Sequence, residues 1–203
     1  MLKLVSGAAA LAFVATTAFA QAPAPAGPSV VRGKVTALAA DGLTVQTAKG
    51  AQKVALTSNW TVAVMKPVAI DAIQPGSFIG TTNMPKGDGQ GTSLEVHVFP
   101  PGVKMGEGHY DWDLKPHAMM TNGTVGKVVA GKKGSRELDV VYNGSGMRHI
   151  VVPAKVPVVQ ITGGTRELVK VGTPVFMVVR KAPDGSMATN SVSVGENGAK
   201  PPM

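Results

Sequence analysis

One short segment of the 203-residue chain concentrates side chains that can bind a metal ion. Residues 100–120 hold two histidines, three methionines and three acidic residues. Imidazole and carboxylate groups suit borderline divalent ions such as zinc, whereas thioethers combined with imidazole favour Cu(I). The segment therefore predicts a metal site, for copper ahead of zinc. Its candidate ligands are Met105, His109, His117, Met119 and Met120.

The same segment also has the composition of a strap between two domains. Prolines at 100, 101 and 116 stiffen it, and methionines commonly fill irregular gaps in apolar contacts. On this interpretation Tyr110, Trp112 and Leu114 are interdomain anchors that pack into grooves on their neighbours. The strap, the metal site and another ligand role remain alternatives.

An internal repeat organises the rest of the chain. A shift of 96 residues places Gly50 on Gly146, and it also superimposes the longer set Gly76 on Gly172, Asp88-Gly89 on Asp184-Gly185 and Val96 on Val192. The glycine matches carry the most weight, because glycine marks turn positions where the backbone needs a positive φ. We predict a duplication with copies at 30–99 and 121–195.

Each copy has the pattern of five short strands. In the first copy we expect strands at 34–38, 43–47, 53–56, 77–82 and 93–99, with a single helical or 3₁₀ turn within 71–76. The predicted fold is all-β, with two tandem, small, antiparallel OB-like barrels at 30–99 and 121–195 joined by the strap at 100–120. Trp60 and Met65 are expected in the core, and His97 and His149 on the solvated surface.

The N-terminus has the pattern of a secretory signal. Lys3 precedes an apolar run, and Ala18-Phe19-Ala20 forms a small-x-small cleavage motif. We expect a signal peptide at 1–20 with cleavage after Ala20, a Pro/Ala-rich linker at 21–29, a tail at 196–203 and a periplasmic or secreted product. No later run reaches the roughly 18 apolar residues of a membrane span. There is no cysteine, which excludes disulfides.

Composition and motifs narrow the function. The usual catalytic signatures are absent, and Ser145 falls in a predicted turn, so we expect no enzyme and no catalytic residue. The formal net charge of +8 suggests an envelope protein or an anionic polymer as partner, although such charge also serves solubility. Few aromatic residues are available as stacking platforms, which argues against nucleic acid. We expect an exported, non-enzymatic binding or interaction protein; the alternative is a periplasmic metal-binding protein.

Three stretches carry a resemblance to a known family: Gly108–Pro116, Met120–Val125 and the Pro-Pro-Met segment at 201–203. With the signal peptide and the two copies, they resemble an exported bacterial family of tandem barrel-like proteins related to a domain of unknown function. That resemblance implies the fold but no activity. Similar sequences are sometimes labelled metal-transporter permeases, and this sequence contradicts the label because a permease needs several membrane spans.

Overall fold

A computed structural model describes residues 28–203; the predicted signal peptide and most of the linker lie outside the described residues. The described chain is all-β, as predicted, and its regular elements are strands and single 3₁₀ turns. None of its helices is long and apolar enough to cross a membrane. The strands are β1 (Ser29–Ala39), β2 (Gly42–Thr47), β3 (Gly50–Pro67), β4 (Phe78–Pro85), β5 (Gln90–Val98), β6 (Gly108–Asp111), β7 (Met119–Ala130), β8 (Arg136–Tyr142), β9 (Gly146–Val152), β10 (Val158–Gly164), β11 (Pro174–Lys181) and β12 (Met187–Gly195). The 3₁₀ turns are η1 (Ile70–Ala72), η2 (Lys132–Gly134), η3 (Arg166–Leu168) and η4 (Glu196–Gly198).

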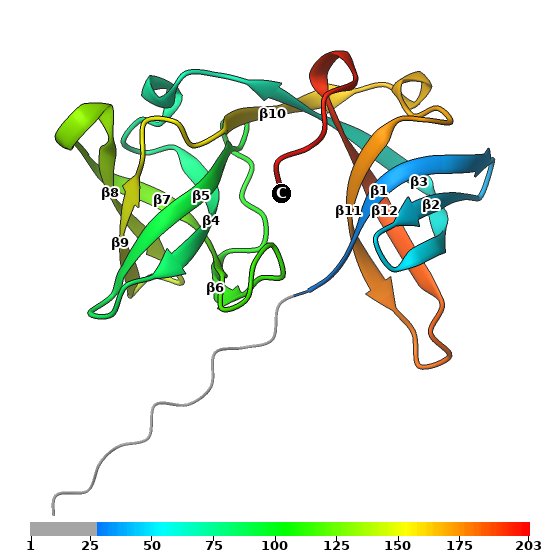
Figure 1. The fold of residues 1–203 in the computed structure, drawn as a ribbon, viewed down its shortest axis with the longest axis horizontal. Helices are drawn as coiled ribbons and strands as arrows, with labels where there is room; N and C mark the ends of the chain where they lie inside the picture. Colours follow the sequence, from blue (N-terminus) through cyan, green and yellow to red (C-terminus); the bar gives the residue numbers. More distant parts are fainter. Residues whose placement is uncertain (1–27) are drawn as a thin grey trace, which may run out of the picture.

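The strands form two closed five-stranded barrels that lie side by side (Figure 1). Barrel 1 runs in the order β1-β2-β3-β12-β11 and returns to β1. Barrel 2 runs β4-β7-β8-β9-β5 and returns to β4. In each barrel one parallel pair completes the ring, β12 with β3 and β5 with β9, while the other pairs are antiparallel. Closure leaves few free sheet edges, which suits strands so rich in valine.

The domain boundaries predicted from the sequence, 30–99 and 121–195, are not those of the barrels. Barrel 1 combines β1, β2 and β3 of the first copy with β11 and β12 of the second, and barrel 2 makes the reciprocal combination. The cause is the length of β3, which has 18 residues. Residues 62–67 of β3 pair with β10, and the strand runs on past its last pairing with β12 at Met65, so the chain that follows delivers β4 and β5 to the other barrel (Figure 1). The two predicted copies therefore exchange strands, as in a domain swap within one chain.

Residues 96 positions apart occupy corresponding places in this exchanged pairing. The Gly76 N–H donates to the Val125 carbonyl oxygen at 2.7 Å, and the Gly172 N–H donates to the Val35 carbonyl oxygen at 2.7 Å. Gly76 has a φ of 84° and Gly172 a φ of 91°. Any other residue at these two turns would be strained, which explains why the glycine matches were informative.

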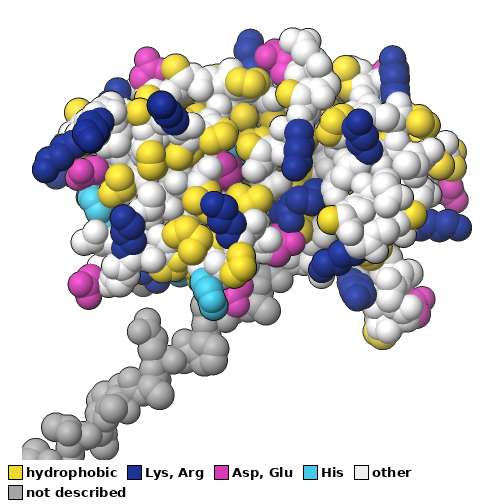
Figure 2. All heavy atoms as spheres, in the orientation of Figure 1, with side chains coloured by type: hydrophobic (Ala, Val, Ile, Leu, Met, Phe, Trp, Pro, Cys, Tyr) yellow, Lys and Arg dark blue, Asp and Glu magenta, His cyan; other side chains and the backbone are white. Residues whose placement is uncertain are grey.

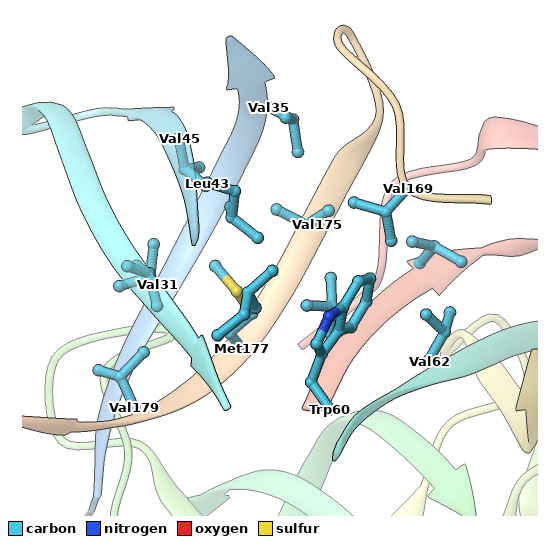
Figure 3. Close-up of a cluster of buried hydrophobic side chains, with 14 residues drawn as sticks. Val31, Val35, Leu43, Val45, Trp60, Val62, Val169, Val175, Met177 and Val179 are labelled. Atoms are coloured by element: carbon cyan, nitrogen blue, oxygen red, sulfur yellow. The ribbon is translucent and has the colours of Figure 1, made fainter. Parts of the chain in front are cut away.

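Each barrel has its own apolar core. In barrel 1 the core joins side chains from β1 and β2 with side chains from β11 and β12, and Figure 3 shows Met177 and Val175 of β11 beside Leu43 of β2. Trp60 lies in this core with 7% of its surface exposed. The expectation that Trp60 is a core residue is confirmed. Met65 is also buried, but in a third cluster that lies between the barrels.

Candidate binding cleft between the barrels

The C-terminal segment turns back between the two barrels (Figure 1), and a cleft there is lined in part by residues 200–203. A space of about 520 Å³ lies beside that segment. It is lined by Arg32 of barrel 1, by Val68 and Val158, which pack on the core of barrel 2, by Leu114 of the strap and by residues 200–203. Lys and Arg side chains are scattered over the face of the molecule seen in Figure 2 and do not gather into one patch. A second pocket of about 560 Å³ is lined by Pro28 and by strap residues from Asp111 to Ala118. The cleft beside residues 199–203 is the candidate site that contacts both barrels.

The segment 199–203 lies inside the cleft as an extended peptide. Pro201 and Met203 are buried, and the Met203 side chain belongs to the cluster between the barrels. Proline fixes φ near the value of a polyproline II helix, which is extended and has no internal hydrogen bonds. Two consecutive prolines therefore keep this short segment straight. The chain turns back at residue 195, where a Cβ would overlap the main chain of Ala199. Glycine has no Cβ and therefore permits this close approach.

Arg32 on β1 is the charged group at the centre of the cleft. Its Nη1 donates to both carboxylate oxygens of Asp113 at 2.8 Å, and its Nε donates to the main-chain oxygen of Met203 at 3.1 Å. The guanidinium group also lies 5.5 Å from the centroid of the Phe176 ring. Its Nη2 is buried and has no hydrogen-bond partner within residues 28–203. Arg32 therefore ties barrel 1, the strap and the 199–203 segment together.

The strap anchors lie in the cluster between the barrels. Trp112 has 7% of its surface exposed, and its ring centroid is 6.2 Å from that of Phe176 of barrel 1. Tyr110 and Leu114 pack against the same cluster. The strap is held to barrel 2 by β6, which pairs with the start of β7. Trp112 thus contacts an element of barrel 1 from a strap fixed to barrel 2.

The prediction that His97 is a solvated surface residue is wrong. His97 is 3% exposed, and its Nδ1 lies 3.2 Å from Oε2 of Glu95, which is 1% exposed. The other oxygen of Glu95 accepts from the Thr82 N–H at 2.7 Å and the Thr82 hydroxyl at 2.6 Å. A Cβ at Gly80 would overlap the His97 ring, so glycine there makes room for the pair. Strand alternation predicts that the outer face of β5 is solvated. In the structure Glu95 and His97 on that face are buried as well.

The five predicted metal ligands are spread over different surroundings. Met105 is 58% exposed, and His117 is exposed with a φ of 62°. Met119 and Met120 are consecutive residues of β7, so they point to opposite faces. His109 shares its pairing row with Thr121, and its Nδ1 lies 2.8 Å from the Thr121 hydroxyl. Within residues 28–203, no three His, Cys, Asp or Glu side chains are arranged to hold a metal ion.

The environment of His109 explains its charge state. The pKa of His109 is lowered from 6.5 to about 4, first because burial disfavours the charged ring and second because Arg148 is nearby, while Asp111 acts in the opposite direction. Its ring stacks on that of Tyr142 with the centroids 6.0 Å apart. Burial also raises the pKa of the neighbouring Tyr110 hydroxyl. His109 is therefore neutral at pH 7 and serves as a hydrogen-bonding partner of Thr121 on β7.

His149 is half-buried rather than freely solvated. Its Nδ1 lies 3.0 Å from Asp139 Oδ1, and its Nε2 lies 3.7 Å from Glu137 Oε2. Both carboxylates stand on β8 and His149 on β9, so the contacts cross a hairpin. β8 and β9 stand at one end of the strand order, so this group is separated by several strands from Arg32 on β1.

Arg32 and the segment 199–203 belong to the candidate site but were not predicted as site residues from the sequence. A signal for Arg32 was present, since it is a charged residue among the valines at 30, 31 and 35. No local pattern could have placed Met203 beside it, because 171 residues separate the two in the chain.

Comparisons of the chain with protein-family models, with curated proteins and with solved structures found no match. The class that the fold and the cleft define is an all-β protein of closed five-stranded barrels with a peptide-filled groove. The functional argument therefore rests on that groove.

Proposed function

We propose that the protein is an exported, non-enzymatic binding module whose cleft accepts an extended, proline-containing peptide of a partner protein. The observation that carries the proposal is the segment 199–203, which fills part of the cleft with such a peptide. Proline-rich peptides are favoured ligands of apolar grooves because they are already extended and lose little entropy on binding. The partner would be a protein of the cell envelope.

The exchanged strands support a binding role by fixing the width of the cleft. β3 and β10 cross between the barrels as an antiparallel pair of six residue pairs. The Arg32–Asp113 contact and the packing of Trp112 on Phe176 add two further links. A groove whose walls are already held in position binds an extended peptide with a smaller entropic cost than a groove that must first be ordered.

The test is peptide binding to a variant that lacks residues 200–203. We expect a synthetic Ala-Lys-Pro-Pro-Met peptide to bind this variant at least about tenfold more tightly than it binds the full chain, because the internal segment no longer competes. A peptide with both prolines replaced by glycine is the control. The same peptide should also raise the Tm of the shortened variant.

A shortened variant that is folded by circular dichroism but binds no better than the full chain would contradict the proposal. If the shortened chain does not fold, Met203→Ser keeps the segment and weakens only its anchor. Tighter peptide binding by Met203→Ser than by the full chain then supports the proposal, and equal binding overturns it.

Export is a separate part of the proposal and is supported by the signal sequence alone. Mass spectrometry of the protein recovered from the envelope fraction should give a mature chain that begins at Gln21. Recovery of an uncleaved chain from the cytoplasm would contradict export.

A further inference from the structure

We propose that the start of β1 is a second binding site, which takes up an extended segment of a partner protein as an added strand. This inference goes beyond the proposed function, because it uses the edge of a sheet and not the cleft. Addition of a strand to an open edge is a common mode of peptide recognition, in which main-chain hydrogen bonds supply the affinity and alternate side chains the specificity.

The start of β1 is paired on one side only. Residues 29–34 pair with β11, whereas pairing with β2 begins at Lys34 and involves the later part of the strand. Within residues 28–203, no strand pairs with residues 29–33 on the side of β2. We call these five residues the β1 edge. An unpaired edge of this kind is a template for another strand.

Barrel 2 has the equivalent edge, and there a strand occupies it. β7 corresponds to β1, since a Cβ at Gly33 would overlap the main chain of β2 and a Cβ at Gly123 would overlap the main chain of β8. Residues 119–124 of β7 pair with β4, and pairing with β8 begins at Thr124. β6 fills the remaining positions by pairing antiparallel with residues 119–122, the counterparts of residues 29–32. The second barrel therefore contains an example of the segment that this edge accepts.

The main-chain groups of two residues point to the β1 edge. Val35 exchanges both of its main-chain hydrogen bonds with the turn before β11. Because successive residues of a strand point their N–H and C=O groups to opposite sides, the odd-numbered residues from 29 to 35 all face β11. Val30 and Arg32 consequently present their N–H and C=O groups on the open side. An added strand can form a hydrogen-bonded pair with each of them.

The side chains of the β1 edge define the chemistry of the added strand. Val31 is 2% exposed and belongs to the core of barrel 1, so the residue opposite it should be apolar. The counterpart of Val31 in barrel 2 is Thr121, which contacts His109 of β6 instead. Val30 is half-buried beside the cluster between the barrels, where the equivalent position of β6 carries Tyr110. The partner segment should therefore present an apolar residue followed by an aromatic residue.

The sequence before β1 is unsuited to fill the edge. It contains Pro23, Pro25 and Pro28, and proline is rare within paired strands because it lacks the N–H group and fixes φ near −65°. The segment that the edge accepts should have no proline at its paired positions. This requirement also separates it from the proline-containing peptide proposed for the cleft.

The probe for this site is a blocked peptide with the sequence of residues 106–111, carrying His109→Val so that an apolar side chain faces Val31. We expect the labelled peptide to bind the full chain in a fluorescence anisotropy titration. Methylation of the main-chain nitrogen at position 110 should weaken binding at least about tenfold, because that N–H faces the β1 edge. Methylation at position 109 is the matched control and should change the affinity less than about threefold, since that N–H points away from the edge.

Val30→Pro tests the same contact from the side of the protein. This variant loses an N–H group on the open side and keeps every hydrogen bond to β11, so it should remain folded by circular dichroism and should not bind the peptide. If it does not fold, the two methylated peptides and the unaltered chain still decide the question.

Four results would overturn the proposal. They are no binding of the unmethylated peptide, equal affinities of the two methylated peptides, displacement of the probe by Ala-Lys-Pro-Pro-Met, and self-association of the chain that Val30→Pro removes. Displacement would place the probe in the cleft, and self-association would show that a second copy occupies the edge. The proposed function is tested with a different peptide and would stand if the β1 edge binds nothing.

Discussion

Met65 on β3 faces Ile161 on β10 across an antiparallel pair, and the two residues are 161 − 65 = 96 positions apart. A residue and its counterpart in the predicted repeat therefore meet at the centre of the crossing. On either side of this pair, Lys66 pairs with Gln160 and Val64 with Thr162, and the shift of 96 residues turns each of these two pairs into the other. Such a meeting is what a two-fold relation between the halves would produce at the point where they exchange strands. Each barrel consequently depends on both halves of the chain.

We predict that Trp112→Ala lowers the free energy of unfolding by about 3 kcal/mol, because it removes a buried ring that links the strap to barrel 1. Urea denaturation measures the change. Leu38→Ala, at a position that is 42% exposed, is the control and should change stability little. A loss below about 0.5 kcal/mol for Trp112→Ala would show that the ring does not join the barrels.

We predict that Glu95→Leu lowers the free energy of unfolding by about 3 kcal/mol, because it leaves His97 and the Thr82 donors buried without their acceptor. The double variant Glu95→Leu/His97→Leu should lose less than the sum of the single variants, since replacing both partners removes the unpaired group. Additive losses within about 0.5 kcal/mol would contradict this coupling. Ser193 of barrel 1 corresponds to His97 and pairs with Phe176. Ser193→Ala is therefore the control and should leave the free energy of unfolding nearly unchanged.

The pKa of His109 predicts an acid-sensitive stability. The folded protein holds this pKa at about 4, below its ordinary 6.5, so the unfolded chain binds the proton more readily. Stability is therefore complete above pH 6.5 and falls as the pH drops towards 4. The loss should be roughly 1 kcal/mol, because the half-buried ring keeps part of its hydration. Tm measured from pH 7 to pH 4 should fall less in His109→Asn, which can keep a bond to Thr121 but does not titrate in this range. Equal slopes for the two proteins would contradict the role of His109.

The placement of the predicted metal ligands leads us to expect weak metal binding. Met119 and Met120 point to opposite faces, and Met105 and His117 are exposed. Titration with Cu(I) and Zn(II) under chelator competition should give affinities no tighter than micromolar, unchanged in His109→Ala and His117→Ala. Tighter binding that is lost in either variant would favour a metal-binding protein over the peptide module.

The local structure could be predicted from the sequence, but the choice of strand partners could not. Gly76 and Gly172 marked their turns because only glycine tolerates those φ values easily. The exchange is different, because counterparts 96 residues apart present the same local pattern. The Val35 N–H donates to the Thr173 carbonyl oxygen. Ser77, the counterpart of Thr173 in the first copy, has the same local pattern and would be an equally suitable partner. In the structure β3 continues for 18 residues towards the other barrel, but in the sequence its run past residue 62 resembles an ordinary strand followed by a loop.

The cleft residues were hard to predict for a related reason. His97 stands on a face that alternation assigns to water, but its ring is buried beside Glu95 and Phe99. The strap anchors Tyr110, Trp112 and Leu114 were recognisable, because large side chains between two domains have few other places to pack. Arg32 takes its role from Asp113 and Met203, which are remote in sequence.

The most direct test of the strand exchange is a disulfide between β1 and β11. Val30 pairs with Val178, whereas two separate tandem barrels would place Val30 beside Thr82, since 178 − 96 = 82. The chain has no cysteine, so each engineered pair can be judged alone. After oxidation, peptide mapping of Val30→Cys/Val178→Cys should give a peptide linked between 30 and 178, while Val30→Cys/Thr82→Cys should remain reduced. A link between 30 and 82, with none between 30 and 178, would show that each copy closes its own barrel and would contradict the account.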